Sequence, residues 1–156
     1  LSQAPRLSQL CLTSPQFVNL NWLNGFRLVS LVIQRGTKLV DLSGIETQDS
    51  LKFLMLQDCR AIKKIDKIGS CSELRFLMLD ECGSIESLSA LKSLDNLELL
   101  SFIGDSIIED GKISVLDACK KLRHLRFVDR KAYDKKAEAY SFDQQYFETV
   151  CRSMKV

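Results

Sequence analysis

The chain has few of the residues on which most catalytic and metal sites depend. It contains one histidine, one tryptophan and two prolines among 156 residues. A single histidine leaves no room for a site built from several imidazoles, and the zinc-peptidase pattern H-E-x-x-H is absent. The glycine-rich phosphate loops and the G-x-S-x-G turn are absent as well. The sequence therefore predicts a protein that is not an enzyme and has no cofactor or metal site.

Long apolar runs and an excess of charge of one sign are also lacking. No apolar stretch approaches the roughly 20 residues that a transmembrane helix needs. The 22 basic and 20 acidic residues leave a net charge of +2, which gives no general attraction to nucleic acid or anionic lipid. The chain begins at Leu1 rather than at methionine, so we expect a processed chain or a part of a longer one.

Six cysteines are present, and none of them forms a C-x-x-C pair. With 46% hydrophobic residues, a chain of this length can bury a core without a disulfide framework. Four of the six fall at equivalent inward positions of the repeat described next, where cysteine behaves as a small hydrophobic residue; these are Cys59, Cys71, Cys82 and Cys119. The sequence therefore predicts reduced thiols and a cytoplasmic location.

The strongest signal is an internal repeat. Six segments read L-x-x-L-x-Φ, where Φ is a large apolar residue, and they begin at Leu7, Leu28, Leu51, Leu74, Leu97 and Leu122. The starts are 21, 23, 23, 23 and 25 residues apart. Alternate residues of a strand point to opposite sides, so each segment sends its leucines to one face. One unit cannot bury them alone, and stacked units can, which predicts parallel strands around a continuous core.

The full unit, L-x-x-L-x-L-x-x-C-x-x-I-x-x-I/L-x-x-I/L, resembles the leucine-rich repeat, in a short variant with cysteine where asparagine is commoner. The resemblance covers roughly residues 7 to 130. It implies the α/β class and a right-handed solenoid, with a curved parallel sheet of about six strands and short 3-10 or helical segments on the convex side. We expect the side-chain ladder at the cysteine position to be broken where it is replaced by Pro15, Gly36, Asp105 and Arg130.

The C-terminal part is predicted to close the solenoid. After the candidate N-cap Ser141 comes an apolar stripe at helical spacing, formed by Phe142, Tyr146, Phe147, Val150, Cys151 and Met154. We expect a helix that covers the last repeat, within a C-terminal cap over residues 131–156 of a single domain, 1–156. A partner-binding helix is the alternative. The first six residues are too short to cap the other edge, so upstream sequence or association is expected there.

Two stretches, 102–111 and 126–133, resemble the final repeats of small bacterial leucine-rich-repeat proteins. They share a phenylalanine-rich last strand, an Asp-Gly turn and a basic segment with tyrosine. This resemblance implies a bacterial cytoplasmic protein. Because some proteins of this kind resemble immunity factors that neutralise toxins, it also implies a toxin as one specific partner.

The strand positions that vary between repeats are predicted to form the concave surface. Its centre is an apolar block, defined by Val32, Phe53, Met55, Phe76, Met78 and Leu99. Charged residues are expected to flank the block, with Lys52, Arg75 and Arg123 on one side and Asp58, Asp80 and Glu81 on the other. The exposed His124 and Arg126 continue the central positions in the last repeat. An apolar patch rimmed by charge is typical of a protein interface, so we predict a protein-binding site here.

Three occupants of this face are open: a foreign protein, another copy of the chain, and the chain's own C-terminal tail. A foreign protein is the favoured occupant, which makes the chain a scaffold for protein recognition; a structural fragment of a larger leucine-rich-repeat protein is the alternative. A basic nucleic-acid-binding module ranks last. It would bind nucleic acid through a cluster of basic residues near the C-terminus. The same cluster can be interpreted as a binding site for an acidic protein, or as a surface in contact with solvent only. Its residues are Lys120, Lys121, Arg123, Arg126, Arg130, Lys131, Lys135 and Lys136.

Overall fold

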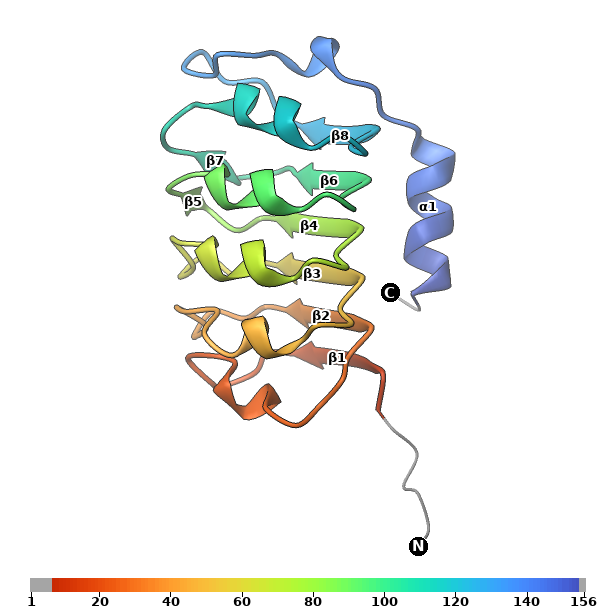
Figure 1. The fold of residues 1–156 in the computed structure, drawn as a ribbon. Coiled ribbons are helices and arrows are strands. Elements are labelled where there is room, and N and C mark those ends of the chain that lie inside the picture. Colours follow the sequence, from red (N-terminus) through yellow and green to blue (C-terminus); the bar gives the residue numbers. More distant parts are fainter. Residues whose placement is uncertain (1–6, 155–156) are drawn as a thin grey trace, which may run out of the picture.

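The computed structural model describes residues 7–154, and its main feature is a six-stranded parallel sheet whose strands follow the order of the chain (Figure 1). Each strand begins at the third residue of one repeated segment, so the predicted solenoid is confirmed. The strands are β1 (Gln9–Thr13), β2 (Ser30–Gln34), β3 (Phe53–Gln57), β4 (Phe76–Asp80), β6 (Leu99–Phe102) and β8 (His124–Phe127).

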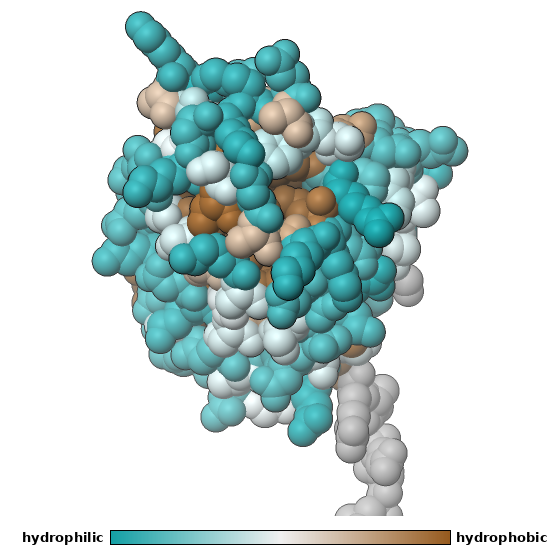
Figure 2. All heavy atoms as spheres, turned by 45° about the horizontal axis from the view of Figure 1, so that its top comes forward, coloured by the Kyte–Doolittle hydropathy of each residue, from teal (hydrophilic) through white to brown (hydrophobic). Residues whose placement is uncertain are grey.

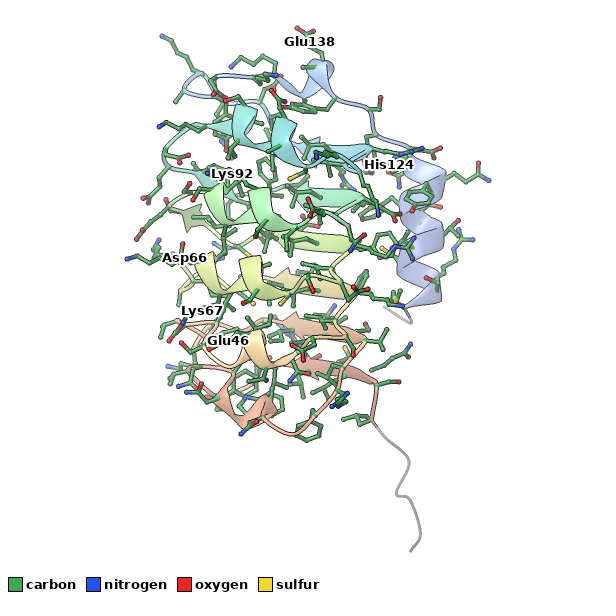
Figure 3. All side chains as sticks on the ribbon, viewed as in Figure 1. Glu46, Asp66, Lys67, Lys92, His124 and Glu138 are labelled. Carbon is green, nitrogen blue, oxygen red and sulfur yellow. The ribbon has the colours of Figure 1, made fainter. Side chains whose placement is uncertain are left out.

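Short 3-10 helices lie on the return paths between these strands, and one more follows β8. They are η1 (Asn21–Leu23), η2 (Ile45–Thr47), η3 (Asp66–Ser70), η4 (Ser89–Ser93), η5 (Ile113–Ala118) and η6 (Ala137–Ala139). Leucines and isoleucines of the first five enter the core, whereas charged residues such as Glu46, Lys67 and Lys92 are exposed on the outside (Figure 3). A second sheet of two short strands, β5 (Ser84–Ile85) and β7 (Ile107–Ile108), joins two neighbouring returns.

The leucines of successive repeats lie side by side in one continuous core. Leu31 pairs with Leu54, Leu54 with Leu77, and Leu77 with Leu100, and all four are fully buried. Burial of a leucine contributes about 1.5–3 kcal/mol relative to exposure. Because each leucine is buried by its equivalents in the neighbouring repeats, this stabilisation is available only to the stack.

Strands β1 to β4 are each followed directly by a residue with positive φ, and Gly104 has positive φ two residues after β6. The backbone N–H there continues the ladder, as when Asp58 donates to the carbonyl of Asp80 at 3.0 Å. This conformation costs a residue other than glycine about 1 kcal/mol or more, so the stack must compensate for it. The residues, with φ between 52° and 69°, are Ser14, Arg35, Asp58, Glu81 and Gly104.

The cysteine of the repeat donates to the preceding strand. Sγ of Cys82 lies 3.2 Å from the carbonyl oxygen of Leu56, and the thiol of Cys59 makes the same contact one repeat earlier. The ladder was expected to break at Asp105, and that expectation is wrong. The hydroxyl of Ser106 donates to the carbonyl of Leu79, the equivalent acceptor, because the longer repeat moves a serine into the place of the cysteine.

The last repeat is closed by an irregular segment. The N–H of Leu125 donates to the carbonyl of Ser141 at 2.8 Å, and the buried ring of Tyr133 packs on Phe127. Seen partly from this end of the stack, hydrophilic residues cover most of the surface and apolar residues gather in a small central area (Figure 2). The capping role that we expected of a helix is therefore performed by the residues before it.

The predicted C-terminal helix is confirmed as α1 (Gln144–Ser153). Its N-cap is Asp143 rather than the expected Ser141, and the Asp143 carboxylate accepts a hydrogen bond from the N–H of Tyr146 at 2.9 Å. Within residues 7–154, no helix combines the length and the apolar character needed to cross a bilayer.

Thiol labelling tests the burial of the repeat cysteines, all four of which lie in the core as predicted. Burial also raises the pKa of Cys71 to about 12, and thiolate is the reactive form. We expect a thiol reagent at neutral pH to label the exposed Cys11 first and the half-buried Cys151 more slowly. The other four should react only in denaturant; rapid labelling of any of them in the folded protein would contradict this core.

Replacement of Gly44 by alanine tests the close stacking of the first two returns. Gly44 has φ +107°, and a Cβ there would lie 2.1 Å from the carbonyl oxygen of Leu20. We expect the free energy of unfolding, measured in urea, to fall by about 3 kcal/mol or more. Gly25→Ala is the matched control, since Gly25 has φ +92° and nothing within 4 Å, so its loss should be only about 1 kcal/mol. Equal losses would contradict the steric explanation.

Candidate protein-binding face

Helix α1 lies on the concave face of the sheet, beside the stack and with its axis along the stacking direction (Figure 1). Beneath it lies the whole apolar block: Phe53, Met78 and Leu99 are fully buried, and Val32, Phe76 and Met55 keep 2%, 6% and 9% of their exposure. The expectation that this block is exposed is therefore wrong. Of the three open occupants, the chain's own C-terminal tail is the one present.

The block and α1 together form a second apolar cluster, separate from the leucine core. The helix contributes the buried side chain of Val150 and the half-buried side chains of Tyr146, Phe147, Cys151 and Met154. The signal for this contact is present in the sequence. The face carries apolar residues where a solvated sheet has polar ones, and the C-terminal stripe has the spacing to cover them.

The helix crosses the strands from the last repeat towards the first. At its start, the Tyr146 ring lies 4.3 Å from that of His124 and 6.5 Å from that of Phe76. Near its end, Met154 shares a hollow with Cys11 and Val32, on β1 and β2. Ten residues at about 1.5 Å each span roughly 15 Å, which corresponds to about three strand spacings.

A charged and polar group fixes the start of α1. The guanidinium Nε of Arg75 lies 2.8 Å from Oε1 of Glu98, and the hydroxyl of Tyr146 donates to Oε2 at 3.1 Å. The ion pair with Arg75, helped by the Tyr146 hydroxyl, lowers the pKa of Glu98. Burial, followed by the Glu98 contact, raises the pKa of Tyr146, so the phenol stays protonated and can donate. Sequence reasoning placed Arg75 on the rim but missed Glu98 as its partner.

The two predicted site residues of the last repeat contact aromatic rings near α1. His124 was expected to be exposed, but it is half-buried and its ring stacks on Tyr146 (Figure 3). Its Nδ1 is buried and has no hydrogen-bond partner among the described residues. The guanidinium carbon of Arg126 lies 5.1 Å from the ring centre of Phe147 and 5.5 Å from that of Phe142. Such cation–π contacts contribute about 0.5–1 kcal/mol each at exposed sites.

Only two of the three residues of the predicted acidic rim are accessible to a partner. Asp80 is buried, and one carboxylate oxygen accepts hydrogen bonds from Ser101 Oγ at 2.8 Å and from the N–H of Ile103 at 3.2 Å. It is therefore a structural residue. Asp58 and Glu81 remain accessible and line a hollow of about 390 Å³ with Gln34, Arg35, Gln57 and Arg60. Lys52, on the opposite side of the block, is exposed.

Most of the C-terminal basic cluster is engaged within the chain. Lys121 donates to Oδ1 of Asn96 at 2.7 Å, Lys136 to the carbonyl of Arg130 at 2.6 Å, and Lys135 pairs with Asp117. The Lys135–Asp117 pair attaches the closing segment to the last repeats, and the other two contacts stabilise the repeats and the segment themselves. They favour the solvated structural face among the interpretations of this cluster.

The linkage between pH and α1 can be tested through Glu98, whose pKa is lowered from its ordinary value of 4.5. A lowered carboxyl pKa stabilises the fold above the ordinary pKa, and the gain is lost as pH falls through the lowered value. We expect Glu98→Gln to reduce the free energy of unfolding in urea by up to about 1 kcal/mol near pH 6, and by nothing near pH 3.

The control for this measurement is Glu86→Gln. Glu86 also pairs with a lysine, Lys64, but at 3.8 Å and with 49% of its side chain exposed. Its effect should be close to zero at both pH values. A loss that is the same at both pH values for Glu98→Gln would contradict the ionic contribution.

Comparison with known proteins supports the fold. No family model and no curated protein matches the chain. Among solved structures, it is similar to an internalin C2 from Listeria monocytogenes, with 27% identity and a TM-score of 0.62, over 76% of this chain and 51% of that one. An internalin from the same organism matches at 14% identity and a TM-score of 0.41, over 78% and 47%.

The chain thus spans about half the length of the internalin structures that it matches. The likeness to internalin C2 agrees with the in-register parallel strands and the short 3-10 returns. Since the sequence pattern, the sheet and this likeness agree, the chain is a leucine-rich-repeat protein.

Proposed function

We propose that the protein is a recognition scaffold that binds a partner protein on its concave side. The observation that carries this proposal is the apolar block, which lies on the sheet face away from the leucine core and is covered by a single helix. A leucine-rich-repeat fold similar to that of an internalin supports protein–protein interaction in general. The mechanism is steric, and it requires no catalytic step.

The partner would contact the accessible rim as well as the centre of the face. Lys52 is exposed on one side, and the half-buried carboxylates of Asp58 and Glu81 lie on the other, where Asp58 also pairs with Arg60 at 2.8 Å. Such charges set orientation and association rate more than affinity. The strands beneath are held in register by the core, so little conformational entropy is lost when a partner binds.

A narrower version of the proposal is a bacterial cytoplasmic protein that neutralises a toxin by covering it. The resemblance of the last repeats to small bacterial proteins supports this version, and the similar Listeria structure is consistent with a bacterial source. The cytoplasmic location follows from the cysteine usage. Co-expression with a candidate toxin tests it: growth should be restored by the intact chain, and failure to restore it would remove that candidate.

A capture experiment tests the general proposal. The full chain is immobilised, and proteins retained from its source organism are quantified by mass spectrometry for the intact chain and for Lys52→Glu. We expect at least one partner to fall about fivefold, since a rim charge contributes about 1 kcal/mol. Lys92→Glu is the matched control, because Lys92 is exposed on η4, on the outer side of the solenoid (Figure 3). Identical retention by all three proteins would contradict a concave binding site.

A further inference from the structure

The groove beneath α1 is periodic. One row of side chains consists of Phe53, Phe76 and Leu99 on paired strands, and a second row consists of Val32, Met55 and Met78. Neighbours within a row are one strand spacing apart, about 4.8 Å, which is close to the α-helical pitch of about 5.4 Å. Residues at i, i+4 and i+8 of a helix lie on one side of it and advance about 6 Å per step, so they pass over two to three strand spacings in all.

Helix α1 lies along these rows with Tyr146, Val150 and Met154, which are spaced by four. The fit depends on spacing and apolar character rather than on one particular sequence. Methionines such as Met55 and Met78 can adjust their side chains to different neighbours. The groove therefore suits amphipathic helices as a class.

The attachment of α1 to the groove is mainly apolar. Val150 is the buried residue of the helix, and the Tyr146–Glu98 contact is the one hydrogen bond between α1 and the solenoid within residues 7–154. The helix supplies its own N-cap, Asp143, and its own i to i+4 ion pair between Glu148 and Arg152, at 3.1 Å. Its local stabilisation therefore does not require the groove.

Helix α1 is connected to the solenoid by a short linker after Ser141, so it can move without opening the solenoid. The chain is fixed to β8 as far as Ser141, through the hydrogen bond from the N–H of Leu125. Two residues then lead to α1, and the cap around Tyr133 lies before this point. Release of the helix would leave both the cap and the leucine core in place.

The groove also continues beyond the last turn of α1. A hollow of about 140 Å³ lies there, lined by Met154 and by residues of the first two strands: Gln9, Leu10, Cys11, Ser30 and Val32. A helix one turn longer than α1 would extend about 5.4 Å farther into this hollow, towards β1.

We propose that the concave groove is a receptor for an amphipathic helix of the partner protein, and that α1 is a tethered occupant which this helix displaces. The partner helix carries apolar or aromatic residues at i, i+4 and i+8, as α1 does, and one further apolar residue that reaches β1. This inference rests on the proposed function and specifies the binding element of the partner.

A peptide with the sequence of residues 141–154 serves as the probe. In the intact chain the tethered helix competes at an effective concentration of the order of mM, so the peptide should bind weakly. Val150→Glu places a charge in the buried centre of the α1 contact and should release the helix. We expect the fluorescently labelled peptide to bind the Val150→Glu chain at least tenfold more tightly than the intact chain, with 1:1 stoichiometry.

Two controls make this result specific. A peptide that itself carries Val150→Glu should not bind either chain. The slow thiol labelling of the core cysteines in the Val150→Glu chain should match that of the intact chain, which shows that the solenoid is still folded. A folded Val150→Glu chain that fails to bind the unmodified peptide would overturn the proposal.

A reversible disulfide that holds α1 in the groove distinguishes a failure of this inference from a failure of the proposed function. Met154→Cys places a thiol in the hollow that the native Cys11 also lines, so oxidation with diamide should join the two as a disulfide, which dithiothreitol reverses. We expect the oxidised chain to capture its partner at least tenfold less well than the same chain after reduction. The double variant with Cys11→Ser cannot form this disulfide and should be unaffected by oxidation.

The outcomes of the disulfide experiment are distinct. Equal capture before and after reduction, with the disulfide verified by mass, would overturn helix displacement and leave concave-side binding intact. Capture that is lost on oxidation and restored on reduction supports displacement. Loss of the partner in Lys52→Glu but not on oxidation would mean that the partner uses the rim alone, which also overturns displacement.

Discussion

Each repeat can bury its leucines only against the next repeat, and the rest of the structure depends on this constraint. The strands must therefore be parallel and in register, so that Leu31, Leu54, Leu77 and Leu100 meet in one row. The same register aligns the positive-φ turns that follow the strands and the donors at the cysteine position. The spacing of about 23 residues between repeats is therefore required by the packing of the core, whatever the protein binds.

A sheet in register has a second consequence, on its other face. Side chains that vary between repeats also form rows across the strands, and neighbours within a row are one strand spacing apart. Two of these rows are apolar in this protein. Exposed rows of this kind would favour aggregation or association, because contiguous apolar surface is rarely left uncovered in a soluble protein. Helix α1 removes this surface from water with a contact of little more than two helical turns. The face is thereby protected, and the groove that we propose for a partner helix is the one that α1 occupies.

The rim and the centre of the concave face have different roles in this arrangement. In the proposed scaffold, the centre would supply apolar contact to a partner helix with the right spacing. The rim, with Lys52 opposite Asp58 and Glu81, would distinguish between partners through charge. Asp80, although acidic and next to this rim, stabilises the end of β4 through Ser101 and Ile103 and contributes nothing accessible.

The sequence alone determined the repeat, the strands, the inward cysteines and the existence of the C-terminal helix, because these follow from local periodicity and from the burial that stacking requires. It also identified the apolar block and most of its charged neighbours. Only the tertiary structure decided where the helix lies, since the same stripe from Tyr146 to Met154 can cover the last repeat or the concave face. The irregular segment around Tyr133 and Ser141 already covers the last repeat. The apolar block on the concave face is therefore the apolar surface available to α1.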